Sequence, residues 1–209
     1  MIPILAAAVL AAGGSGPVRV PAPPAPPAPP VPRAEFHDAM RKLWEDHVTW
    51  TRLYIVSAAA GLADAEQTAQ RLLKNQADIG DAIVPYYGAA AGTGLTALLR
   101  SHILTAAKII AAAKSGDTSV VRSASQAWYA NGDSIADFLS TANPRQWPAT
   151  TLRDGMRMHL DLTLKEATAR LHGDWANDIA AYDAIHLHIL QLADLLSNGI
   201  MRQFPGRFH

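Results

Sequence analysis

Four histidines lie on the apolar faces of segments whose periodicity predicts long helices: His47, His102, His159 and His186. Each is close to the middle of its predicted helix, and the midpoints of neighbouring helices in an up-and-down bundle lie at one level. Buried imidazoles without a ligand need hydrogen-bond partners, and several charged rings would repel one another. Neutral imidazole is the commonest metal ligand. The four rings therefore predict a metal site at mid-height of the core.

Acidic residues stand near these histidines. Asp183 and His186 form a D-x-x-H motif that puts both side chains on one helix face, so we expect Asp183 to complete the ligand set. Asp46 and Asp161 suit a supporting role, in which a carboxylate orients a ligating ring. His188 is two residues from His186 and is predicted to point away from the site.

The residue types restrict the metal without identifying it. Histidine-rich ligation suits zinc, copper or iron. Met156 and Met158 lie just before His159, and a thioether ligand would favour Cu(I), although the position of Met156 favours core packing. Ferritin-like di-iron sites use Glu-x-x-His motifs, and only the D-x-x-H at Asp183 is comparable. Bis-histidine haem ligation is a further alternative, although the chain has no c-type attachment motif.

Composition excludes several function classes. The chain has no cysteine, which removes disulfides, cysteine zinc sites, iron–sulfur clusters and a thiol nucleophile. Its 18 basic and 18 acidic residues balance, without a basic stripe, so no nucleic-acid partner is expected. Neither a phosphate-binding loop nor a G-x-S-x-G nucleophile motif is present. Two alternatives to metal storage, sequestration or redox chemistry remain open: a structural or interaction protein with a metal-free histidine network, and a metal-dependent enzyme.

The elements that must position these residues read as helix after helix, with no strand candidate. Gly61, Gly116 and Gly173 mark predicted helix ends, and a connection containing Gly80 and Pro85 is predicted after one short helix. We predict an all-α, antiparallel up-and-down helical bundle of four to five long helices plus one short helix. The predicted helices are 34–60, 64–75 (short), 87–114, 118–141, 148–171 and 174–202.

The N-terminal region differs from the rest. Residues 1–16 contain the apolar run IPILAAAVLAA followed by small residues, which resembles a signal segment and is too short to span a bilayer. Residues 17–33 include PAPPAPPAPPVP, which predicts an extended proline-rich linker. The bundle domain should occupy residues 34–209. We therefore expect a secreted or cell-envelope protein with no stable membrane span in its mature form.

Several segments carry a resemblance to a known family. They are LWEDHVTWTR, DIGDAIVPYYG, LTALLRSHI, MHLDLT and the long C-terminal run DWANDIAAYDAIHLHILQLADLLSNGIMRQFPGRF. Together they resemble a largely uncharacterised family of small bacterial exported helical proteins, over nearly the whole chain after the linker. Relatives sometimes carry names such as glycosyltransferase or acetylglutamate kinase. Both activities belong to α/β nucleotide-binding folds, whereas this sequence predicts no strands. The resemblance implies that the five candidate ligands lie within the shared segments.

Overall fold

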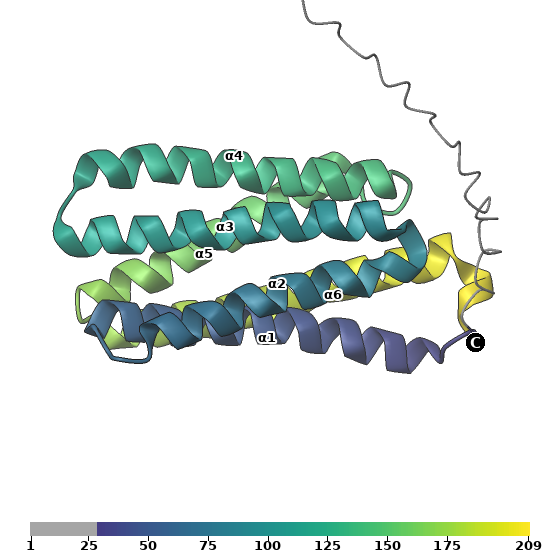
Figure 1. Cartoon of the computed structure of the whole chain (residues 1–209), viewed down its shortest axis with the longest axis horizontal. Coiled ribbons are helices and arrows are strands. Elements are labelled where there is room, and N and C mark those ends of the chain that lie inside the picture. The colour runs from purple at the N-terminus through teal and green to yellow at the C-terminus, as the bar shows by residue number, and fades with distance from the viewer. Residues whose placement is uncertain (1–28) are drawn as a thin grey trace, which may run out of the picture.

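The structure, a computed structural model, describes residues 29–209, and that part of the chain is all-helical as predicted (Figure 1). Six long helices are followed by a single 3-10 turn, η1. Their bounds are α1 Arg33–Ala60, α2 Ala65–Tyr87, α3 Ala89–Ser115, α4 Thr118–Ala142, α5 Ala149–Leu171, α6 Trp175–Gln203 and η1 Pro205–Arg207.

The predicted number of long helices was wrong, because the segment after Asn75 continues as helix instead of forming a connection. α2 runs on through Gly80 and carries Pro85 within its last turn. Gly80 serves close packing here, since a Cβ added to it would lie 2.7 Å from the backbone oxygen of Gly92 in α3. Gly92 likewise permits this close approach, since a Cβ added to it would lie 2.8 Å from the backbone oxygen of Gly80. The bundle has six long helices and no short one among the described residues.

Consecutive helices pack against each other, and α1 also packs against α6, so that the six helices form a closed ring. Figure 1 shows α3 and α4 side by side, with α1, α2 and α6 grouped on the other side and α5 crossing obliquely behind. α1 additionally contacts α3 and α5 across the ring. Side chains from α1, α3 and α5 can therefore meet in the interior.

Local signals fix several of the helix ends. The side chain of Asp117 accepts a hydrogen bond from the Val120 amide at the start of α4, and Asp174 does the same for Asn177 at the start of α6. Gly61 and Gly116 adopt positive φ just after α1 and α3, a conformation that glycine tolerates best. These positions agree with the ends predicted from the sequence.

The two ends of the described chain meet at one end of the bundle. The amide of Val31 donates to the carbonyl of Arg207, and the amide of His209 donates to the carbonyl of Val31. The predicted signal-like segment of residues 1–16 and most of the predicted linker lie outside the described residues. The last residues of that linker thus pair with the C-terminal tail.

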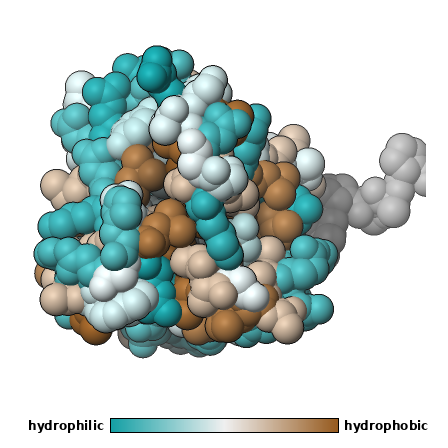
Figure 2. Space-filling model, turned by 90° about the vertical axis from the view of Figure 1, so that its left-hand side faces the viewer, coloured by the Kyte–Doolittle hydropathy of each residue, from teal (hydrophilic) through white to brown (hydrophobic). Residues whose placement is uncertain are grey.

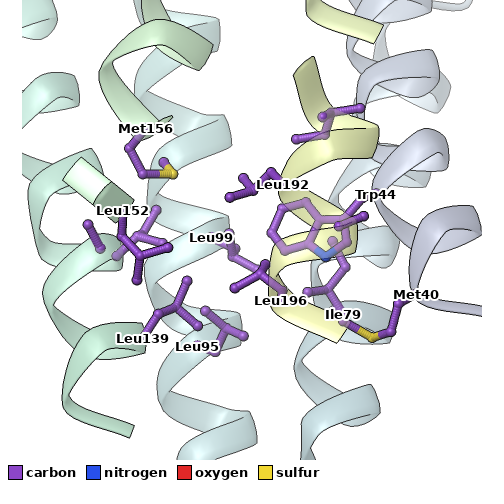
Figure 3. Packing of buried hydrophobic residues seen from close by; sticks show 14 of the residues in the cluster. Met40, Trp44, Ile79, Leu95, Leu99, Leu139, Leu152, Met156, Leu192 and Leu196 are labelled. Carbon is purple, nitrogen blue, oxygen red and sulfur yellow. The ribbon is translucent and has the colours of Figure 1, made fainter. Parts of the chain in front are cut away.

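A single large hydrophobic cluster fills the ring of helices (Figure 3). Trp44 of α1, Leu99 of α3, Met156 of α5 and Leu192 of α6 converge there. The opposite end of the molecule from the termini carries the turns between α1 and α2, α3 and α4, and α5 and α6. Figure 2 shows hydrophobic residues there surrounded by hydrophilic ones.

One described helix, α3, is long and apolar enough to cross a membrane when judged by length and composition alone. A core helix of a soluble bundle meets the same two criteria. Here α3 packs between α2 and α4 and contributes His102 and Leu99 to the interior.

Candidate functional site

Three of the four predicted histidines come together in the core. The ring centroid of His159 lies 5.5 Å from that of His47 and 6.0 Å from that of His102. All three side chains are buried, and they come from α5, α1 and α3. We call His47, His102 and His159 the histidine triad. Their convergence agrees with the expectation that helix midpoints share one level.

The placement of His186 and Asp183 on the inner face was wrong. His186 faces outward from α6, where its Nε2 lies 2.9 Å from Glu45 Oε1, and Asp183 is exposed. The inner face of α6 carries Asp178, Ala181, Ile185 and Ile189. The predicted face was rotated by about one residue, or about 100°.

His188, which was predicted to point away, lies beside the triad instead. Its ring centroid is 6.4 Å from that of His159, and the two rings are nearly parallel. Its Nε2 donates to the backbone oxygen of Gly155 at 2.9 Å, so its Nδ1 carries the lone pair. Because the inner face of α6 is rotated from the predicted one, His188 lies where His186 was expected.

The His102 ring is held in one tautomer by Asn131 of α4. The Asn131 amide nitrogen donates to the Leu98 carbonyl at 3.2 Å, which fixes the orientation of the amide group. Asn131 Oδ1 therefore accepts from His102 Nδ1, at 2.9 Å. His102 Nε2 is left with a free lone pair, as in ligating histidines whose other ring nitrogen donates to an oxygen.

His47 is held differently. Gln76 Nε2 donates to the Leu72 carbonyl at 2.8 Å and lies 3.3 Å from His47 Nδ1. This arrangement makes His47 Nδ1 an acceptor and places the ring proton on Nε2. Gln76 Nε2 also lies 3.1 Å from Asn75 Oδ1, so its second hydrogen is shared between that oxygen and His47 Nδ1, and the Asn75 amide donates to the Leu43 carbonyl. Neither Asn131 nor Gln76 was singled out from the sequence, where isolated amides carry no recognisable signal.

The central ring, His159, lacks such a partner. Its Nδ1 is buried without a hydrogen bond among the described residues. Indole rings flank the triad, with Trp44 5.9 Å from His47 and Trp128 4.9 Å from His102 between ring centroids. Buried polar atoms without a protein partner are rare, and a bound water or ion is a common reason for one.

A small cavity of about 10 Å³ adjoins the triad. Its walls are the three rings, Trp44, Met156 and aliphatic leucine and isoleucine side chains, with no acidic residue. The volume is close to the least that holds one water molecule, and it is far too small for a porphyrin.

The triad is neutral at physiological pH. Burial lowers the pKa of His47 to about 3, with a further contribution from the nearby His102 ring. Burial likewise lowers the pKa of His102 to about 4, although the hydrogen bond with Asn131 opposes the shift. The pKa of His159 falls well below its ordinary value because of burial and its three histidine neighbours. Neutral imidazole is the form that binds metals.

The ring nitrogens do not yet form a ready coordination site. Within residues 29–209, no group of three or more histidine, aspartate or glutamate side chains has the arrangement that would hold a metal ion. The rings are grouped, but their donor atoms do not converge on one point. Binding would therefore require the rings to turn in place.

A second buried polar cluster lies about 10 Å further along α5, two helical turns from His159. Arg52 Nη1 donates to Glu166 at 3.0 Å, and Arg52 Nη2 donates to Asp178 at 2.8 Å. Arg170 Nη1 also donates to Asp178, at 3.3 Å. We call Arg52, Glu166, Arg170 and Asp178 the ion cluster. The sequence alone did not indicate this buried pairing, because its members lie far apart in the chain.

The two carboxyl groups of the ion cluster differ in their protonation. Burial raises the pKa of Glu166 to about 7, against the opposing effect of Arg52. Burial would also raise the pKa of Asp178, but hydrogen bonds from Arg52 and Arg170 hold it below its ordinary value. Asp178 is thus the permanent anion of the cluster.

Comparison with known proteins gave no further guide to this site. No protein-family model, curated protein or solved structure matches the chain.

Proposed function

We propose that this protein binds a transition-metal ion through the histidine triad, in a storage, sequestration or redox role. The observation that carries the proposal is the buried, unpartnered Nδ1 of His159 at the centre of three neutral rings beside a small cavity. Asp183 and His186 leave the ligand set, and His188 takes a supporting position next to His159.

The spacing of the rings supports this function. Three imidazoles bound to one ion at about 2.0–2.1 Å have ring centroids about 5 to 5.5 Å apart. The separations of the His159 ring from His47 and from His102, 5.5 and 6.0 Å, are close to that range. The side-chain torsion that turns a histidine ring has broad energy wells, so rotation in place is a modest change. His102 already directs a lone pair away from Asn131, whereas His47 and His159 have to reorient.

The size of the cavity favours binding over catalysis. Pockets for small-molecule substrates occupy about 300–1,000 Å³, much more than the space beside the triad. A catalytic metal also keeps an open coordination position that a substrate can reach. We propose in addition that the protein acts in the cell envelope or outside the cell, as residues 1–16 predict.

Metal analysis of full-length protein purified without a histidine tag tests the proposal. We expect about one bound transition-metal ion per chain, as a four-coordinate site with protein ligands would hold. The double variant His102→Leu/His159→Leu should lose it. The matched control His172→Leu/His186→Leu removes two exposed imidazoles and should keep it. Circular dichroism should show both variants helical.

A second candidate function is a structural or interaction protein whose buried histidines only specify packing. The hydrogen bonds from His102 to Asn131 and from Gln76 to His47 favour it, since they satisfy those rings without any ion. Metal-free protein that takes up no zinc, copper or iron on titration, with or without the His102→Leu/His159→Leu change, would establish this alternative.

A further inference from the structure

The walls of the cavity bear on the charge of the ion. None of the residues that line it is acidic, and the nearest side of the ion cluster is about 10 Å away along α5. Asp46 pairs with Lys42, and Asp161 accepts from Tyr129. An ion in this cavity therefore has no anionic ligand. The cost of burying an uncompensated ion rises with the square of its charge, which favours a monovalent cation over a divalent one.

The only sulfur in the cavity wall comes from Met156. It lies three residues before His159, so both side chains occupy the same face of α5. Figure 3 shows Met156 extending from α5 into the core, with Leu192 of α6 and Trp44 of α1 on the facing side. Met158, which directly precedes His159 in the sequence, is 54% exposed and takes no part. Soft thioether ligands select Cu(I), and imidazole also binds copper.

We propose that the resident ion is Cu(I), held by the histidine triad with the Met156 sulfur as a fourth ligand. This inference rests on the metal-binding function proposed above and identifies its ion. Three neutral nitrogens and one thioether give a site with total charge +1. The surrounding leucine and isoleucine side chains exclude water, and a hydrophobic shell of this kind controls the redox behaviour of a bound metal. Cu(II) fits less well, since it carries a second charge and prefers tetragonal coordination.

Competition titrations of the full-length apo-protein test this assignment. Cu(I) is titrated without oxygen against bathocuproine disulfonate, and Zn(II) is titrated against a chromophoric zinc chelator. We expect Cu(I) to bind tightly and Zn(II) to bind weakly. Since loss of even an outer partner costs about 10–100-fold in metal affinity, Met156→Leu should lower the Cu(I) affinity at least about tenfold. X-ray absorption should show a copper–sulfur contribution that this variant lacks.

Met158→Leu is the matched control, because it removes the neighbouring exposed thioether and should leave Cu(I) affinity unchanged. Equal affinities for Met156→Leu and Met158→Leu, or absence of a copper–sulfur signal in the wild type, would overturn the thioether assignment. Tight Zn(II) binding that depends on His102 and His159, with weaker Cu(I) binding, would overturn the choice of ion while the metal-binding function stands. If neither ion binds, both proposals fall together.

Discussion

The bundle contains two buried polar clusters two helical turns apart, and they solve the problem of burial in opposite ways. The ion cluster keeps Asp178 ionised and pairs it, because Arg52 and Arg170 both donate to this carboxylate, and Arg52 also donates to Glu166. The histidine triad gives up its charge instead, and its central ring keeps a nitrogen without a partner. One cluster is closed to further ligands, and the other is incomplete.

The distribution of unpartnered atoms sharpens this contrast. Five buried side-chain nitrogen or oxygen atoms of the described residues lack a hydrogen bond, and four belong to the triad or to residues touching it. They are His159 Nδ1, Gln76 Oε1, Trp44 Nε1 and Trp128 Nε1. None belongs to the ion cluster. Because unsatisfied buried groups cost about 1–3 kcal/mol each, their concentration around the triad supports the proposed metal site.

The largest expected effect comes from breaking the ion cluster. Asp178→Ala leaves Arg52 and Arg170 without their shared anion, and removal of one partner from a buried ion pair typically costs about 3–5 kcal/mol. The comparison variant His159→Leu removes an unpartnered nitrogen and keeps most of the volume, so it should change stability by less than about 1.5 kcal/mol. Urea unfolding of metal-free protein measures both. A His159→Leu cost equal to that of Asp178→Ala would contradict the contrast between the clusters.

The next effect is an opposite response of the two clusters to pH. The folded-state pKa values of His47 and His102, about 3 and 4, lie below the ordinary value of 6.5. Below pH 6.5 the unfolded chain therefore binds more protons than the folded one, and stability falls as pH drops toward 3. Each ring contributes a slope of up to about 1.4 kcal/mol per pH unit. His102→Leu should reduce this acid loss.

Glu166 acts in the other direction. Its folded-state pKa of about 7 lies above its ordinary value of 4.5. Its contribution to stability is therefore full below pH 4.5 and is lost as pH rises through 7. Glu166→Gln should flatten the profile between these values without affecting the acid loss. Urea midpoints of the wild type, His102→Leu and Glu166→Gln between pH 3 and 7 give the three profiles of stability against pH. Parallel profiles for the two variants would contradict the opposite roles assigned to His102 and Glu166.

The sequence predicted much of the triad but failed at α6, for a physical reason. His47, His102 and His159 lie on apolar stripes that burial confirms. In α6 two helix faces carry apolar residues at helical spacing, and the face that contains Ile179 begins with the more hydrophobic residues. The true inner face begins with Asp178, which periodicity counts as a surface residue because its two arginine partners lie on other helices. Because this pairing cannot be seen in the sequence, the predicted inner face of α6 was rotated, and His186 was placed beside the other histidines where the structure has His188.

In the fold as well, features set by nearby residues were predicted correctly, whereas features set by residues far away in the chain were not. Helix ends at Gly61 and Gly116 follow from nearby residues and were predicted correctly. The length of α2 depends on α3, because Gly80 lies against the backbone of Gly92. A glycine required for close packing resembles a glycine that ends a helix when only the sequence is read. The sequence therefore predicted four to five long helices and one short one, where the structure has six long helices.

A smaller effect tests the hydrogen bond that prepares His102. Asn131→Leu removes the acceptor for His102 Nδ1 and the donor to the Leu98 carbonyl, which should cost about 1–3 kcal/mol. It should also lower metal affinity about 10–100-fold, because the ring loses its fixed tautomer. Ser134→Ala, an exposed change on the same helix, should alter stability by no more than about 0.5 kcal/mol. Unchanged affinity in Asn131→Leu would show that His102 is not a ligand.

The smallest effect separates two histidines that stand two residues apart on α6. His186 makes an exposed pair with Glu45, and surface pairs of this kind contribute about 0–1 kcal/mol. His188 is half-buried, donates to the Gly155 carbonyl and stacks against His159. His188→Ala should therefore lower the free energy of unfolding more than His186→Ala does, by about 1 kcal/mol for the lost hydrogen bond. Only His188→Ala should weaken metal binding, because the His159 ring loses the neighbour that it stacks against. Urea unfolding and metal titration of the two single variants decide the matter. If metal affinity depends more on His186 than on His188, then His186 faces the site, as the apolar pattern of α6 predicts from sequence. The metal site would then not be the histidine triad.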